Sequence, residues 1–259
     1  MQKTAIRLKG RTNHDGPLQS WGSESRFTER GTRHEPTKSG AIGLLAAALG
    51  RRRTDSVDDL ASLEFGVRID QPGSFEGDFQ TEHKRVWDKD RARWIVDVSK
   101  SLPLTRRHYL ADAVFVAAFE GDSELLYACA QALDSPVFPL FLGRRSCPPA
   151  CRVLLGILED ETLLGALKKH PWEASRRYQA SWKQRDKEFV DLEVLYDGCS
   201  STVGEGYDVV QRDVPVSFSQ EHRRYSFRTV SHATVSVRNP EYVGQFTDHD
   251  PWLALGKEA

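Results

Sequence analysis

The sequence has few cysteines, and their spacing does not match a metal site. Cys147 and Cys151 bracket Pro148-Pro149-Ala150 without a second pair or a histidine partner nearby, and the other two are Cys129 and Cys199. Structural zinc sites need closely spaced pairs of Cys or His ligands. We therefore expect free thiols, no bound metal and no cofactor.

Long apolar runs are also missing. No apolar signal segment stands at the start, and no run approaches the length of a membrane span. We therefore expect a cytoplasmic protein without a membrane partner. The 259 residues, 39% hydrophobic and 28% charged, suffice for one large domain or for one domain with an appendage.

The chain has no excess of either charge, since its formal net charge is −1. This balance excludes nucleic-acid binding by bulk charge and leaves only a local basic surface. Basic residues do cluster along the sequence, and only their convergence in space would form a groove. The clusters are Arg51-Arg52-Arg53, Lys84-Arg85, Arg106-Arg107, Arg144-Arg145 and Arg223-Arg224.

The strongest local pattern predicts a short helix over residues 37–50. Thr37 or Ser39 can cap its start, no proline interrupts it, and Gly50 stands where a left-handed stop would fall. Because the helix is apolar nearly all round, we expect it between a sheet and another layer. Its free N–H groups, its dipole and Lys38 favour a bound phosphate. The alternative is an ordinary buried helix with a polar cap.

Hydrophobic periodicity predicts an α+β unit over residues 1–150 and a β-rich extension over residues 151–259. The order of elements in the first unit matches a ferredoxin-like or RRM-like fold with a projecting β-hairpin. The expected strands cover 3–9, 60–70, 109–120 and 137–142, the helices 37–50 and 123–133, and the hairpin about 78–107. In the extension, strands are expected at 190–195 and 209–218.

Two stretches carry arginines that could contact phosphates. In Gly143-Arg144-Arg145-Ser146, glycine leaves room for a nucleic-acid backbone, and both arginines can fork onto phosphates. The alternative is a turn with solvated arginines. Between residues 23 and 35, Arg26, Arg30 and Arg33 could reach a phosphate or pair with nearby glutamates.

A third stretch, Arg106-Arg107-His108-Tyr109, could cleave RNA without a metal. His108 or Tyr109 would act as a general base on a 2′-hydroxyl, and Arg106 or Lys100 would stabilise the developing charge. The protein would then be a metal-independent endoribonuclease.

Five blocks, taken in chain order, resemble the CasD subunits of type I-E CRISPR Cascade complexes, which belong to the RAMP family. They are Gly16–Gly22, His34–Gly40 with the helix that follows, Arg106–Ala113, Pro139–Pro149 and Asp213–Phe218. The chain departs from its relatives at residues 11–15, which separate the first strand from the Gly-Pro-Leu-Gln loop.

The resemblance implies a non-catalytic subunit for antiviral defence that caps the 5′ handle of the guide RNA (crRNA). In these systems the subunit CasE cuts the RNA, and the projecting hairpin, or thumb, lies across the guide. The implied partners are the CasC backbone subunit, the CasA large subunit and, indirectly, target DNA near the PAM. A splayed base would stack on Trp21 or Tyr109. The implied RNA-binding residues are Gln19, Ser20, Trp21, Arg26, Lys38, Ser39, Arg106, Arg107, Tyr109, Arg144, Arg145 and Ser146.

Overall fold

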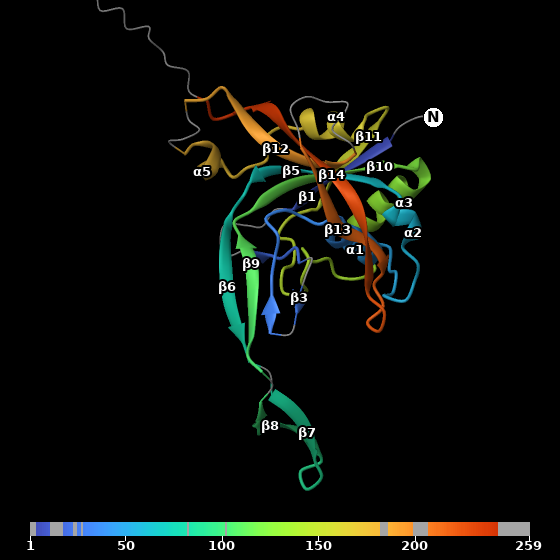
Figure 1. Cartoon of the computed structure of the whole chain (residues 1–259), viewed down its shortest axis with the longest axis vertical. Coiled ribbons are helices and arrows are strands. Elements are labelled where there is room, and N and C mark those ends of the chain that lie inside the picture. The colour runs from blue at the N-terminus through green and yellow to red at the C-terminus, as the bar shows by residue number, and fades with distance from the viewer. Residues whose placement is uncertain are drawn as a thin grey trace, which may run out of the picture.

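The computed structural model describes residues 4–10, 18–22, 25, 26, 28–81, 83–101, 103–181, 186–198 and 207–242. The side chains of Arg26 and Lys100, Cys199 and the segment 11–15 lie outside this part. The fold is a sheet-rich mixture of strands and a few short helices (Figure 1). No helix in the described residues is both long and apolar enough to cross a membrane.

One antiparallel sheet of seven strands, counted over the described residues, forms the body. The strands lie side by side in the order β11-β1-β10-β5-β12-β14-β13. Elements from both sides of residue 150 therefore share this sheet. The division at residue 150 stays a prediction. The strands are, in spatial order, β11 (Leu154–Glu159), β1 (Thr4–Gly10), β10 (Val114–Gly121), β5 (Glu64–Gln71), β12 (Phe189–Asp197), β14 (Arg224–Arg238) and β13 (Asp208–Ser217).

Helices cover both faces of the sheet. On one face, α1 (Lys38–Ala48), α2 (Asp58–Ala61) and α3 (Ser123–Asp134) pack on a core that contains Phe115 and Phe119 of β10. On the other face, α4 (Leu163–Lys168) packs with Val116 and Ala118 of the same strand. Successive side chains of a strand point to opposite faces, so β10 is buried on both, as its continuous apolar run predicts. A short helix, α5 (Arg176–Gln179), follows α4.

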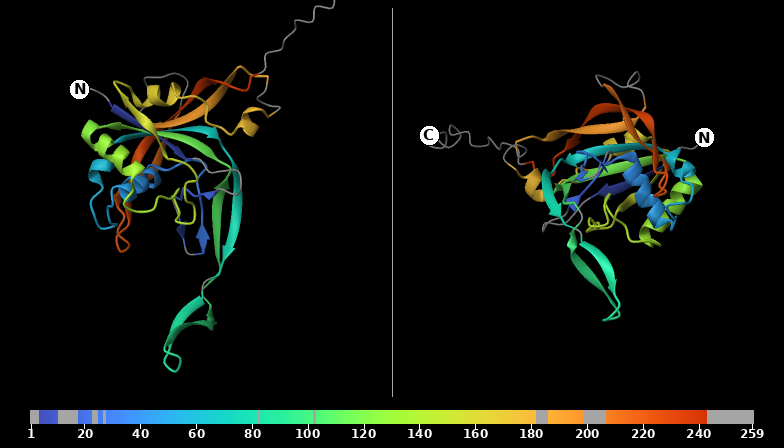
Figure 2. Two further views of the ribbon diagram at one scale, coloured as in Figure 1. Left: turned by 180° about the vertical axis from the view of Figure 1, so that it is seen from behind. Right: turned by 60° about the horizontal axis from the view of Figure 1, so that its bottom comes forward.

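A long β-arm projects from this body (Figures 1 and 2). Its base pairs β6 (Ser74–Gln80) with β9 (Thr105–Ala111), and its tip pairs β7 (His83–Asp88) with β8 (Arg93–Ser101). A small sheet beside the base joins β9 to β2 (Leu18–Gln19) and β4 (Glu29–Arg30), and β4 to β3 (Ser25–Arg26). The predicted projecting hairpin is confirmed, and it is longer than the predicted range of 78–107.

The predicted single strand at 109–120 is wrong because it is two strands. Asp112 adopts φ +55° between β9 and β10. Gly73 packs against the residues on either side of Asp112, and a Cβ added to Gly73 would lie 2.4 Å from the carbonyl oxygen of Ala111. The chain turns sharply at this point. The arm and the central sheet are thereby separated.

The predicted strand at 137–142 is also wrong. The backbone N–H groups of Val137 and Phe138 donate to the carbonyls of Ala48 and Ala47 at the end of α1, and Pro139 has no N–H to offer a neighbouring strand. This apolar segment therefore caps a helix, and β11 takes the sheet position beside β1. In the extension, the strands predicted at 190–195 and 209–218 are confirmed as β12 and β13.

Candidate nucleic-acid interface

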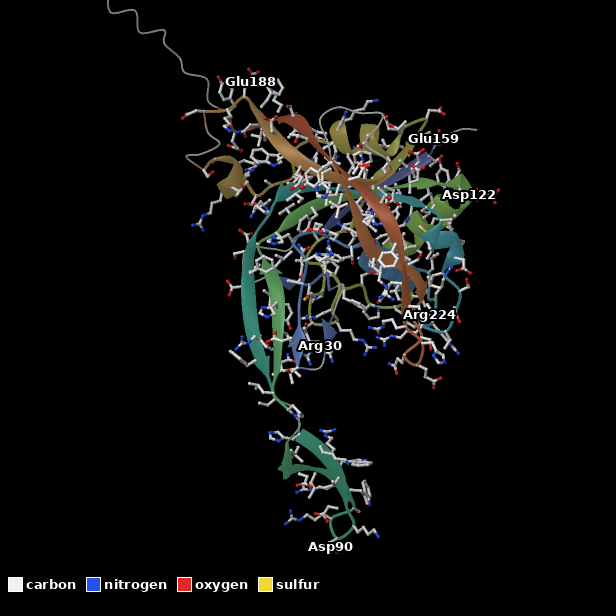
Figure 3. All side chains as sticks on the ribbon, in the orientation of Figure 1. Arg30, Asp90, Asp122, Glu159, Glu188 and Arg224 are labelled. Carbon is white, nitrogen blue, oxygen red and sulfur yellow. The ribbon has the colours of Figure 1, made fainter. Side chains whose placement is uncertain are left out.

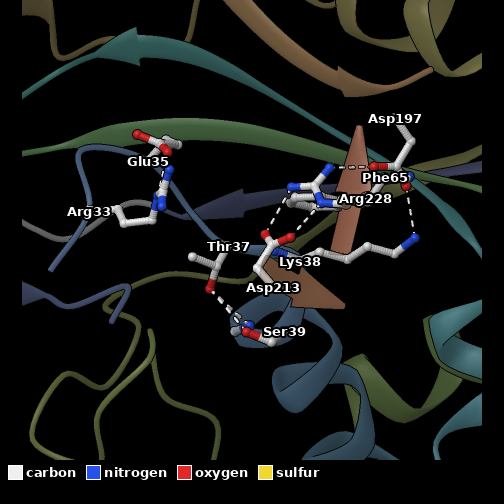
Figure 4. A network of polar contacts seen from close by, with 10 residues as sticks. Arg33, Glu35, Thr37, Lys38, Ser39, Phe65, Asp197, Asp213 and Arg228 are labelled. Carbon is white, nitrogen blue, oxygen red and sulfur yellow. Dashed lines mark hydrogen bonds and ion pairs between the residues drawn. The ribbon is translucent and has the colours of Figure 1, made fainter. Parts of the chain in front are cut away.

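A carboxylate of the chain itself occupies the N-terminus of α1 (Figure 4). The Thr37 hydroxyl accepts a hydrogen bond from Gly40 N at 3.2 Å. The Lys38 backbone N–H donates to Oδ2 of Asp213 at 2.8 Å, and its ammonium Nζ donates to Oδ2 of Asp197 at 2.8 Å. An aspartate thus satisfies one of the N–H groups, and meets the same dipole, that would attract a phosphate. The predicted anion at Lys38 is therefore Asp213, which follows 175 residues later in the chain.

Arg228 completes this network. Its guanidinium donates to both oxygens of Asp213, at 2.6 and 2.9 Å, and to Asp197. Burial alone would lower the pKa of Arg228, but hydrogen bonds and charge from Asp213 and Asp197 outweigh it and raise the pKa. Two cations thus face two anions in a mostly buried cluster, and its charges balance.

The predicted Gln19–Trp21 loop is also internal. Gln19 Nε2 donates to the carbonyl of Ala113 at 2.8 Å, and the indole Nε1 of Trp21 donates to Gln19 Oε1 at 3.0 Å. The Ser20 hydroxyl donates to the carbonyl of His108 at 3.1 Å. All three side chains are buried, although Ser20 and Trp21 also line the edge of a cleft described below. With 3% of its surface exposed, Trp21 does not offer a free face for a base.

The Gly143–Ser146 loop is anchored on this internal loop. Gly143 has φ +84°, and an added Cβ would lie 1.7 Å from the carbonyl oxygen of Ser20, so only glycine fits. The guanidinium of Arg144 lies 4.8 Å above the ring centre of Tyr109 and donates to backbone carbonyls of residues 30, 31 and 108. Arg144 therefore covers the buried Tyr109, whose ring is not free to stack on a base. Arg145 and Ser146, by contrast, are exposed.

A cleft of about 690 Å³ opens between α1, this loop and the hairpin that joins β13 to β14. Three of the five basic clusters converge on it, through Arg51–Arg53, Arg145 and Arg223. None of the described residues that line it is acidic. Figure 3 shows Arg224, next to Arg223, at the end of this hairpin. The aromatic residues that line the cleft are Trp21, Phe138, Phe141, Phe218 and Tyr225.

One acidic residue lies behind this cleft. The carboxylate of Asp59 on α2 accepts hydrogen bonds from both terminal nitrogens of the Arg51 guanidinium. The hydrogen bond to Arg51 lowers the pKa of Asp59, and the same hydrogen bond raises the pKa of Arg51. The clusters at 51–53 and 223–224 are visible in the sequence, but no local pattern assigns them to the site. Their convergence depends on the packing of α1 against β13, which no local pattern encodes.

The fourth cluster lies apart, on β9. Arg106 Nε lies 3.9 Å from a carboxylate oxygen of Glu29 on β4, and Nε2 of His108 lies 3.1 Å from the other. Tyr109 points to the opposite face and is buried, while Arg107 is half-buried. The structure therefore does not bring Tyr109 to the surface beside His108. No group of three or more His, Cys, Asp or Glu residues in the described part could hold a metal ion.

Comparisons with known proteins agree on one family. Residues 13–231 match the model of the family described as CRISPR-associated protein (Cas_Cas5). The chain is 33% identical over 153 residues to the CRISPR system Cascade subunit CasD of Escherichia coli (strain K12), a match that covers 54% of this chain and 67% of that protein.

Two solved structures have similar folds. A chain of a CRISPR RNA-guided surveillance complex has a TM-score of 0.69 at 29% identity, with 98% of each chain covered. A crystal structure of a Cas protein has a TM-score of 0.61 at 34% identity, with 93% of this chain and 97% of that chain covered.

Proposed function

From the premise that this chain belongs to the Cas5 family of CRISPR-associated proteins and is a CasD-type subunit of a surveillance complex, we propose that it caps the guide RNA. It binds the repeat-derived 5′ handle of the guide and joins the backbone of a type I-E complex to the large subunit. Such a complex works in the cytoplasm in antiviral defence.

The arginine-lined cleft is the observation that carries this proposal. Five arginines converge there, and none of the described lining residues is acidic, which favours a polyanion. Arginine binds phosphate through paired hydrogen bonds, and the apolar wall formed by Phe138 and Phe141 suits bases or sugars. Of the residues that the sequence predicts for RNA, Arg145 and Ser146 are exposed on the loop beside the cleft, and Arg106 is exposed on β9.

We also propose that the subunit does not cleave RNA. The general-base candidate Tyr109 is buried beneath Arg144. The pair of His108 and Glu29, at 3.1 Å, favours the alternative of a metal-independent repeat endoribonuclease. Repeat RNA incubated with the protein in EDTA distinguishes the two. A discrete shortened product that His108→Ala abolishes would establish the enzyme, whereas uncut RNA is expected.

The exposed arm supports contacts with neighbouring subunits. Trp87 and Trp94 at its tip are 49% and 61% exposed, on a two-stranded ribbon that has no core of its own. We propose that the arm lies across the guide next to a CasC-type backbone subunit. A CasA-type large subunit would adjoin the chain, and target DNA near the PAM would be an indirect partner.

We infer further that the chain contains a ferredoxin-like unit whose fourth strand, β11 (Leu154–Glu159), lies beyond the predicted limit of residue 150. The spatial order β11-β1-β10-β5, with α1 between β1 and β5 and α3 between β10 and β11, supports this arrangement. The strands β12 to β14 would then be the β-rich extension, packed as a continuation of the same sheet.

Nuclease protection of the guide in the assembled complex tests the proposal. Complexes assembled with this chain are expected to protect the repeat-derived 5′ end, and complexes that lack it are expected to lose that protection while the spacer stays covered. Equal protection of the 5′ end in both preparations would overturn the capping role. Sequencing the 5′ ends of co-purified RNA gives the same answer from an independent readout.

A further inference from the structure

The base of the arm carries an exposed aromatic and cationic face. The pairing of β6 with β9 places Phe79 opposite Arg106, Gly77 opposite His108 and Phe75 opposite Leu110, so these residues share one side of the ribbon. Phe75 is 48% exposed and Phe79 is 57% exposed. Exposed large aromatic side chains grouped on one face mark a binding surface more often than isolated ones do.

Each phenylalanine ring already contacts one cationic or aromatic side chain. The guanidinium of Arg106 lies 4.9 Å from the ring centre of Phe79. At the other end of the face, the ring of His34 contacts Phe75 edge-on, with ring centres 4.4 Å apart. Arg106 and His108 both lie beside the carboxylate of Glu29. The face is therefore aromatic and, at Arg106, cationic.

Gly77 lies midway between the two phenylalanines and leaves the floor open. A Cβ added there would meet, among the described residues, only Nδ1 of His108, at 3.9 Å. Glycine weakens a strand interior, and it commonly marks a place where a ligand approaches the backbone closely. At about 3.3 Å per residue, Phe75 and Phe79 stand about 13 Å apart. Three bases stacked between two rings make four steps of about 3.4 Å, or about 14 Å, so the spacing suits about three bases.

We propose that this face, defined by Phe75, Gly77, Phe79 and Arg106, binds a short run of unpaired bases by stacking. The inference rests on the proposed function, because it places a second contact on the RNA held in the cleft. The loop that borders the cleft also contacts the base of the arm, since Arg144 donates to the carbonyl of His108. Aromatic rings with an overlying arginine suit bases, which offer π-faces on an anionic backbone.

A base-analogue experiment tests this face. Single 2-aminopurine substitutions at successive positions of the guide report stacking as quenched fluorescence. With the wild-type chain we expect quenching at one short run of positions. Phe79→Ala should relieve it there and weaken RNA binding by about fivefold to a hundredfold, the range measured for one lost base stack. Phe227→Ala is the matched control. Phe227 lies on β14, is 65% exposed and, like Phe79, has an arginine over its ring, in this case Arg212 of β13.

A second variant keeps both aromatic side chains. Gly77→Leu fills the open floor without a backbone clash, so the chain should fold. We expect it to relieve quenching at the same guide positions as Phe79→Ala. If quenching persists in both variants, the stacking face is overturned while the cleft stands. If both variants lose only incorporation into the complex, the face binds protein and the inference is also overturned. If the wild-type chain binds no RNA, the proposed function fails with it.

Discussion

The two ends of α1 differ in how their charges are compensated. At the N-terminus, Lys38 and Arg228 are matched by Asp197 and Asp213, and the cluster is mostly buried. Past the C-terminus, Arg51–Arg53 meet Arg145 and Arg223 around an open cleft whose described lining residues include no acid. The carbonyls at a helix C-terminus also favour nearby cations. A basic cluster whose charges are matched inside the protein is closed to a ligand, whereas the cleft arginines line open space, even though Asp59 pairs with Arg51 behind it.

Removing the carboxylate at the closed end should have the largest effect. Asp213→Ala leaves Arg228 and the first N–H of α1 without their main acceptor, which we expect to lower the free energy of unfolding by about 3–5 kcal/mol. Urea denaturation measures it, with the exposed Asp78→Ala as control. A stable variant that gains or loses RNA affinity would contradict the view that this end is purely structural.

Disturbing the loop that borders the open end should have a smaller effect. Gly143→Ala forces φ +84° on a residue with a side chain and clashes with Ser20. We therefore expect the free energy of unfolding to fall by about 1–3 kcal/mol. The protein that still folds should bind RNA more weakly. Gly43→Ala is the matched control, because a Cβ there would only contact Phe218 at 3.8 Å inside a helix. Equal stability of the two variants would show that the loop can relax away from Ser20.

The weakest predicted effect concerns the acid behind the cleft. Asp59 is partly exposed, so Asp59→Asn should cost only about 0.2–1 kcal/mol at neutral pH. Because Arg51 lowers the pKa of folded Asp59, this stability is present above the ordinary pKa of an aspartate and is lost as pH falls through the lowered value. RNA affinity should rise slightly, since Arg51 gains freedom. The urea midpoints of the wild-type chain and of Asp59→Asn, measured against pH, test this loss of stability. A gap between them that widens toward acid would contradict it.

The elements of this fold are encoded more locally in the sequence than the site is. The helix over 37–50 follows from local pattern and is confirmed as Lys38–Ala48, and of the two candidate caps, Thr37 and Ser39, the structure uses Thr37. The apolar run at 137–142 was indistinguishable from a strand because its hydrogen-bond partners lie at the far end of α1. Lys38 looked available because Asp197 and Asp213 come more than 150 residues later. The arginine clusters were visible in sequence, but only tertiary packing decides which of them meet.

The salt dependence of handle-RNA binding tests the central claim most directly. The affinity of the wild-type chain, of the double variant Arg145→Ala with Arg223→Ala, and of Lys38→Met is measured against salt concentration. Each lost phosphate contact on a single strand should reduce the slope by about 0.7, so the double variant should lose about 1.4 and Lys38→Met should lose nothing. An unchanged slope in the double variant, with a reduced slope in Lys38→Met, would place the RNA at the opposite end of the helix.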